Sequence, residues 1–219
     1  MNWANIIKAI IETILMTSVS TVFAYLIGLP VGVLLYITSK KGLKPNKTLN
    51  MILGTFVNIF RSIPCLLLII ILIPVTNIII GKGMWSGYWY SMVIPLVVAS
   101  FGFVARMVEQ SLTEINSGVI EAAKSLGASN WQIIKKVLLT EAMPSLVSGF
   151  AVSVVSIIGY TSFAGYIAGG GLIYHAFNLG YYGTEKVGMW LCILFVVIIV
   201  QVIQEGGLFI AKKLDKRRK

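Results

Sequence analysis

Long apolar segments separated by short polar ones set the pattern of this chain. Five of these segments contain about 20 or more mainly apolar residues, the length that crosses the hydrocarbon core of a bilayer as a helix. They cover residues 13–37, 53–80, 88–106, 145–168 and 187–210. The pattern therefore predicts an all-α integral membrane protein with five transmembrane helices and a single domain that fills residues 1–219.

Composition supports the same class of protein. Apolar residues make up 57% of the chain and charged residues 12%, whereas a soluble domain has about a quarter charged residues. The mean hydropathy is +0.88. The first segment is too long for the core of a signal peptide and has no basic region before it, so we expect no cleavage. Prolines are expected to bend two segments, with Gly28-Leu29-Pro30 acting on the first, and Pro64 and Pro74 on the second.

The net charge of +10 is explained by how the basic residues are distributed between the apolar segments. If the five segments alternate in direction, fourteen of the 18 Lys and Arg residues lie on one side. These are Lys40, Lys41, Lys44, Lys47, Arg106, Lys124, Lys135, Lys136, Lys212, Lys213, Lys216, Arg217, Arg218 and Lys219. Lys8, Lys82 and Lys186 lie on the other side. Because basic residues favour the cytoplasmic side, the N-terminus is predicted outside the cell and the C-terminus in the cytoplasm.

Basic residues next to membrane segments are typical of contact with lipid headgroups. A nucleic-acid surface is the competing interpretation of the basic tail, and the position of these charges disfavours it. We therefore expect membrane lipid as a partner and no nucleic acid.

A polar stretch interrupts the apolar pattern between the third and fourth segments, in a loop of about residues 107–143. It reads Glu121-Ala122-Ala123-Lys124-Ser125-Leu126-Gly127. Asn116 or Ser117 can cap a short helix here, and Gly127 can end it in the left-handed conformation. The segment 129–132 has the spacing of a capping box that begins a second short helix. Two consecutive alanines would let a partner approach the first helix closely, and Glu121 is expected near its N-terminus, where the helix dipole favours a carboxylate.

Residues that carry catalytic or metal chemistry are sparse. The sequence has no Gly-x-x-x-x-Gly-Lys-Ser/Thr phosphate loop, and the single His175 is far in sequence from the two cysteines, Cys65 and Cys192. Both cysteines fall in apolar segments, where they act as small hydrophobic residues. We predict that the chain is not an enzyme and binds no metal or cofactor, so that any energy for transport comes from a separate ATPase.

Inside the apolar segments, Arg61 is the exceptional charge. A central arginine costs roughly 2.5–3.5 kcal/mol on insertion scales, so it is expected to face protein or water, or else to snorkel to the headgroups. In the fourth segment, four residues at helical spacing share one face, which favours either close helix packing or a polar translocation path. They are Gly149, Ser153, Ser156 and Tyr160. Phe163 follows near the predicted outer mouth, where its ring forms either a gate or ordinary packing.

The predicted outer loop of residues 165–186 combines three glycines at 169–171 with several aromatic residues. Consecutive glycines allow a sharp, left-handed backbone. The tyrosines are typical of an aromatic belt at headgroup depth. We interpret the loop as both a belt and a mouth against which an external binding protein docks.

The polar stretch resembles the cytoplasmic coupling loop of ABC-importer permeases, with Glu121, Ala122, Ala123 and Gly127 at the matching positions. Val137 replaces the usual isoleucine downstream, and Thr140 replaces the usual proline. Four further stretches are similar to permeases of methionine importers, so that the resemblance covers about residues 10–211. These stretches are Phe60 to Pro64, Ala105 to Glu109, Ile158 to Tyr160, and the glycine run followed by Tyr181-Tyr182.

This resemblance implies a fold with a coupling helix between transmembrane helices three and four. It also implies a prokaryotic permease that pairs with a second copy of itself, two copies of a cytoplasmic ATP-binding subunit and an extracytoplasmic substrate-binding lipoprotein. The implied substrate is methionine, in L and often D form. A permease for another polar amino acid or small osmolyte would share the loop. A stand-alone channel or secondary transporter is the third alternative, although those folds tend to carry inverted repeats and intramembrane carboxylates.

Overall fold

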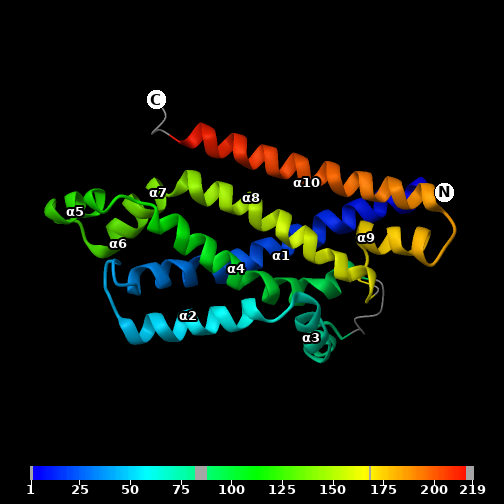
Figure 1. Cartoon of the computed structure of the whole chain (residues 1–219), viewed down its shortest axis with the longest axis horizontal. Helices are drawn as coiled ribbons and strands as arrows, with labels where there is room; N and C mark the ends of the chain where they lie inside the picture. The colour runs from blue at the N-terminus through cyan, green and yellow to red at the C-terminus, as the bar shows by residue number, and fades with distance from the viewer. Residues whose placement is uncertain (1, 82–87, 168, 216–219) are drawn as a thin grey trace.

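The computed structural model describes residues 2–81, 88–167 and 169–215, and every regular element within them is helical (Figure 1). The long helices are α1 (Trp3–Thr38), α2 (Lys47–Ser62), α3 (Cys65–Ile80), α4 (Val93–Thr113), α8 (Met143–Tyr160) and α10 (Lys186–Leu214). The shorter elements are η1 (Trp89–Met92), α5 (Ser117–Ser125), α6 (Asn130–Gln132), η2 (Ile133–Leu138), α7 (Leu139–Glu141), η3 (Thr161–Gly165), α9 (Gly171–Ala176) and η4 (Phe177–Tyr181).

Within these residues, four helices are long and apolar enough to cross a membrane, and α2 with α3 makes a fifth crossing if the bent pair counts as one. The predicted all-α, multi-spanning class is therefore confirmed. Some bounds differ from the expectation. The first helix begins at Trp3, ten residues before the predicted start, because the side chain of Asn2 caps it by accepting a hydrogen bond from the Ala4 amide. The third runs on to Thr113, into the predicted loop. The expected end of the fourth segment at Ala168 lies outside the described residues.

The second apolar segment is two helices rather than one continuous helix. The axes of α2 and α3 differ in direction by 99°. Proline cannot donate a helical hydrogen bond and disfavours helical backbone in the residue before it, and Ile63 accordingly has extended angles of φ −77° and ψ 122°. The predicted bend at Pro64 is thus a complete break. In contrast, α3 continues through Pro74 and α1 through Pro30 without interruption.

Close packing of α1 on α4 forms the centre of the bundle. A side chain added at Gly28 would place its Cβ 2.8 Å from the carbonyl oxygen of Phe101, and one at Gly32 would be 2.4 Å from that of Ala105. Only glycine allows the two backbones to approach this closely, as in other membrane helix pairs with small residues four positions apart. The glycine predicted to help bend α1 therefore serves as a contact surface for α4.

The two ends of the bundle differ in charge. Figure 1 shows the α1–α2 connection, α5, α6 and the end of α10 at one end, with the N-terminus and α9 at the other. The first end carries the described members of the predicted cytoplasmic set except Arg106, which lies within α4. These members lie in the α1–α2 connection and at the start of α2, in α5 and η2, and in the last turn of α10. Lys82 and residues 216–219 lie outside the described residues.

Candidate functional site

The segment 116–132, which we call the polar hairpin, projects at the basic end of the bundle (Figure 1). The Asn116 side chain caps α5 by accepting a hydrogen bond from the Gly118 amide at 2.8 Å. At the other end of α5, the Gly127 amide donates to the Lys124 carbonyl at 2.9 Å, and the Ala128 amide donates to the Ala123 carbonyl at 3.1 Å. This pair of bonds is a Schellman motif, and Gly127 has the φ of 79° that the motif requires.

The second arm of the polar hairpin begins with the predicted capping box. The Ser129 hydroxyl accepts from the Gln132 amide at 3.4 Å, and the Gln132 side chain accepts from the Ser129 amide at 2.8 Å. The chain then continues as the π-helical turn η2, whose residues Ile133 and Leu138 are fully buried. They belong to a core cluster that includes residues of α1 and α4, so the hairpin is anchored to the bundle.

The four predicted docking residues do not share one environment. Glu121, Ala122 and Gly127 are exposed, whereas Ala123 is partly buried and packs against the core cluster. Ala122 is therefore the alanine that a partner can approach. The expectation for Glu121 is wrong in one respect, because it is the fifth residue of α5 and the first turn contains no acidic residue. The dipole of a helix acts within its first turn.

Sequence reasoning missed the apolar surface of the polar hairpin. Leu126 is 88% exposed and Trp131 is 70% exposed, beside the turn at Gly127. Large apolar side chains exposed outside the membrane segments mark a surface that contacts a partner. The signal was present in the sequence, since these are the large apolar residues that flank the turn of an otherwise polar stretch.

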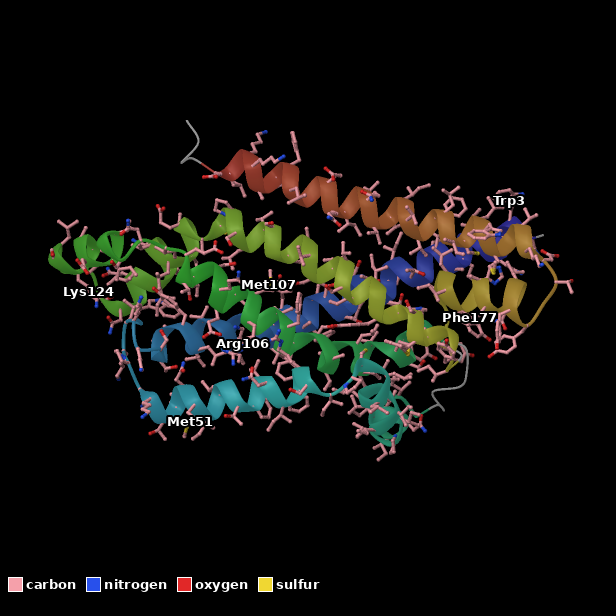
Figure 2. The ribbon with its side chains drawn as sticks, viewed as in Figure 1. Trp3, Met51, Arg106, Met107, Lys124 and Phe177 are labelled. Carbon is pink, nitrogen blue, oxygen red and sulfur yellow. The ribbon has the colours of Figure 1, made fainter. Side chains whose placement is uncertain are left out.

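The polar stripe on α8 divides into two parts. The first part packs against neighbouring helices: a Cβ at Gly149 would lie 3.2 Å from the Met107 side chain of α4, which points toward α8 in Figure 2. The Ser153 hydroxyl is fully buried, donates to the Gly149 carbonyl at 2.7 Å and accepts from the Tyr25 hydroxyl of α1 at 3.2 Å. The Ser156 hydroxyl is partly exposed and donates to the Val152 carbonyl at 2.9 Å.

The second part of the stripe reaches a cavity. Tyr160 and Arg61, which are 99 residues apart, both line a cavity of about 220 Å³ at the break between α2 and α3. We call it the Arg61 cavity; its walls also include Phe60, Cys65 and Phe103. Arg61 is exposed on this chain and makes no hydrogen bond or ion pair with any residue that the structure describes.

Phe163, the predicted gate residue, is partly buried in η3. It packs against a buried cluster that includes Met16 of α1, Ile69 of α3 and Leu96 of α4. The contact corresponds to the packing alternative for this ring. A role as a gate remains a prediction.

At the opposite end of the bundle, α9 is fixed to α1. The Glu12 carboxylate accepts from the Gly171 amide at 3.0 Å, and the Thr13 hydroxyl accepts from the Leu172 amide at 2.8 Å. Gly170 and Gly171 have φ values of 71° and 83°, so two of the three glycines adopt the expected left-handed backbone. Burial lowers the pKa of His175 in α9, while the carboxylates of Glu12 and Glu185 oppose that shift. Within the described residues, no three His, Cys, Asp or Glu side chains gather as they would around a metal ion.

A bundle of helices long and apolar enough to cross a membrane, with a capped hairpin at its basic end, agrees with the architecture that the resemblance to importer permeases implies. The chain belongs to the family of binding-protein-dependent transport system inner membrane components, whose sequence profile matches residues 28–217. It is thus a membrane component of a transport system and not the ATPase.

Several relatives are permeases named for methionine transport. The probable D-methionine transport system permease protein MetI of Pasteurella multocida is 37% identical over 215 residues, which cover 98% of both chains. The D-methionine transport system permease protein MetI of Escherichia coli K12 is 41% identical over 160 residues, or 73% of this chain and 72% of the relative. Among solved structures, an inward-facing MetNI methionine ABC transporter has a chain that matches with a TM-score of 0.93 and 38% identity, covering 98% of each chain.

Proposed function

We propose that this chain is the permease subunit of an ATP-driven importer of methionine. The observation that carries the proposal is similarity along the whole chain, rather than at one motif, to permeases named for D-methionine transport. The structural likeness to a methionine ABC transporter covers the same length. The bundle supplies the path through the membrane, and hydrolysis of ATP by a separate subunit drives it.

The proposed assembly contains a second copy of this chain, two copies of a cytoplasmic ATP-binding subunit and an extracytoplasmic substrate-binding lipoprotein. The family description, a binding-protein-dependent transport system, supports the last of these. The chain is proposed to cross the membrane with its N-terminus outside and its C-terminus in the cytoplasm, because the basic end of the bundle then faces the cytoplasm.

In this orientation, the polar hairpin meets the ATP-binding subunit. The exposed Ala122 lets the partner approach the α5 backbone, while Leu126 and Trp131 offer apolar area for burial. The inward-facing residues Ala123, Ile120 and Ile133 join the hairpin to the core at the ends of α1 and α4. A displacement of the hairpin by its partner would therefore be carried into two membrane helices.

Uptake by the purified complex tests the proposed function. The permease is isolated with the ATPase and binding protein that copurify with it, placed in liposomes, and supplied with labelled L-methionine. ATP should drive uptake, and unlabelled L- or D-methionine should compete with it better than histidine or glycine betaine. Equal uptake without ATP would indicate a channel or secondary transporter, and better competition by another amino acid would overturn the choice of methionine.

The orientation has its own test. A reporter that is active only outside the cytoplasm is fused after the C-terminus in one strain and inserted at the exposed Gly183 in another. The first fusion should be silent and the second active. The reverse result would place the polar hairpin outside the cell and contradict docking to a cytoplasmic ATPase.

A further inference from the structure

We propose that the Arg61 cavity binds the substrate within the membrane path, with the Arg61 guanidinium holding the carboxylate of an amino acid that has an apolar side chain. This inference rests on the proposed function and adds a binding site to it. Its ligand class is a zwitterionic amino acid, of which methionine is the expected member.

The position of Arg61 along α2 favours contact with protein or water. The basic residues from Lys40 to Lys47 mark one membrane surface, and α2 begins at Lys47 and runs alongside α4 (Figure 1). Arg61 lies fourteen residues further on, or roughly 21 Å along a helix. An arginine within a membrane-crossing segment is costly against hydrocarbon and almost always faces protein or water. Its side chain is exposed on this chain and lines the Arg61 cavity, and we place the path on this side of α2.

A second arginine shows how this fold supplies hydrogen-bond acceptors to a guanidinium that has a structural role. Arg106 of α4 points toward α2 in Figure 2. It donates to the Glu109 carboxylate at 2.6 Å, to the Asn58 side chain at 2.9 Å and to the Gly54 carbonyl at 3.2 Å. Helix α2 thus provides acceptors to Arg106, whereas Arg61 on the same helix has none among the described residues. An unpaired guanidinium next to a cavity is available to a ligand.

The other walls suit the rest of the ligand. Phe60, Phe103 and Tyr160 surround the cavity with aromatic rings, and Cys65 adds a polarizable sulfur. Thioethers make favourable contacts with aromatic rings, and a guanidinium binds a carboxylate through two parallel hydrogen bonds. A volume of about 220 Å³ is smaller than the roughly 300 Å³ at which pockets for drug-sized molecules begin, and is suited to one amino acid.

The break between α2 and α3 contributes backbone groups to the same cavity. Helix α3 begins at Cys65, and Pro64 before it supplies no side-chain cap. The first hydrogen bond into the helix is from the Leu68 amide to the Pro64 carbonyl, which leaves the amides of the preceding turn without a helical acceptor. Their positive end lies beside Arg61 and adds to the attraction for an anionic group.

Cys65 allows the site to be tested by chemical protection. The chain has two cysteines, so Cys192→Ser leaves Cys65 as its one thiol. In the complete complex in lipid, the rate at which methyl methanethiosulfonate modifies Cys65 is measured by mass spectrometry, without nucleotide and during turnover. L-Methionine should slow the modification, and L-methioninamide, which lacks the carboxylate, should require a concentration about tenfold higher or more.

Variants assign the effect to the guanidinium. Arg61→Gln should raise the methionine concentration needed for protection by about tenfold or more, and Arg61→Lys should raise it less because the charge remains. Lys47→Gln, which removes a charge from the opposite end of α2, should leave protection unchanged. Equal protection by methioninamide and methionine in the Cys192→Ser complex would overturn the proposal, and that comparison needs no variant at Arg61.

The outcomes also separate this site from the proposed function. A complex that imports methionine with ATP while Cys65 stays unprotected retains the function and refutes the site. Failure of the complex to import methionine in liposomes would refute the proposed function itself.

Discussion

The polar hairpin is completed by hydrogen bonds between residues that lie close in the sequence, whereas the Arg61 cavity is completed by side chains from α2, α3, α4 and α8. Each cap of the hairpin joins residues at most five positions apart. In the cavity, Phe60 and Tyr160 are a hundred residues apart. Local hydrogen bonding can therefore be read from residue types, but a cavity depends on how the helices pack.

The two regions also differ in how their residues tolerate substitution. The hairpin depends on one backbone conformation, because a left-handed residue at Gly127 closes the Schellman motif. The cavity depends on one unpaired charge, since Arg61 contributes nothing to the described hydrogen bonds of the bundle. Substitution in the hairpin is thus expected to change coupling, while substitution in the cavity is expected to change ligand binding with little effect on stability.

The largest effect is expected at Gly127. A β-branched residue with φ near 79° carries about 1–3 kcal/mol of strain, so Gly127→Val should open the turn and reduce ATP-driven methionine uptake by about tenfold or more. Gly127→Asn should retain most uptake, because asparagine adopts left-handed backbone more readily. Gly206→Val provides a control, since nothing lies within 4 Å of that position. Full uptake by Gly127→Val would show that the turn has no part in coupling.

The second prediction compares the two arginines by stability. Arg106→Met removes two hydrogen bonds that join α4 to α2 and one within α4, and should lower the free energy of unfolding by about 1.5–3 kcal/mol. Arg61→Gln removes no described bond and should change that energy far less. Thermal unfolding of both variants in the same detergent measures the difference. If both variants lowered the free energy of unfolding equally, Arg61 would have a structural partner and would not be available to bind a ligand.

Much of the hairpin could be predicted from the sequence, and little of the cavity. The caps of the hairpin can be predicted because their hydrogen bonds join residues close in sequence, at Asn116, at Gly127 and in the segment 129–132. Pro64 predicts where the second segment bends. It does not specify the angle, which is 99° between α2 and α3. The sequence around Gly28 indicates a bend, since Phe101 and Val104 of α4, which this glycine contacts, lie more than seventy residues away.

Two further elements show the same limit. The sequence predicts a loop where the structure has helix α9. The first amides of α9 are capped by Glu12 and Thr13 of α1 rather than by neighbouring residues, so no local capping signal indicates this helix. Arg61 and Tyr160 line the same cavity because α2 and α8 both pack against α4, and the sequence alone does not specify that packing. The exposure of Leu126 and Trp131 is a different case, because a large apolar residue in a short polar stretch can be either buried or exposed, and the stretch alone does not specify which.

The third prediction concerns the apolar surface of the hairpin. Trp131 is 70% exposed, so Trp131→Ala should leave the stability of the isolated permease unchanged. If its ring is buried against the ATP-binding subunit, the affinity for that subunit should fall by roughly tenfold. Titration of the ATP-binding subunit against immobilised permease provides the measurement. Unchanged affinity would remove Trp131 from the proposed interface.

The smallest effect is expected at Phe163. Because the ring packs against the cluster of Met16, Ile69 and Leu96, Phe163→Leu preserves an apolar contact and should cost less than about 1.5 kcal/mol. Liposomes that contain this variant should hold methionine as tightly as the wild type when ATP is absent. A leak without ATP would instead support a gate at this position.

The central claim is that the polar hairpin lies against the ATP-binding subunit, and cross-linking from α5 tests it most directly. A photo-activated cross-linker is attached to Ala122→Cys, which is exposed, or to Ala123→Cys, which is partly buried, in a chain whose two natural cysteines are replaced by serine. Position 122 should cross-link to the ATP-binding subunit in the complete complex, and position 123 should react mainly within its own chain. Cross-links from position 122 to the extracytoplasmic binding protein, or to no other subunit, would contradict the claim.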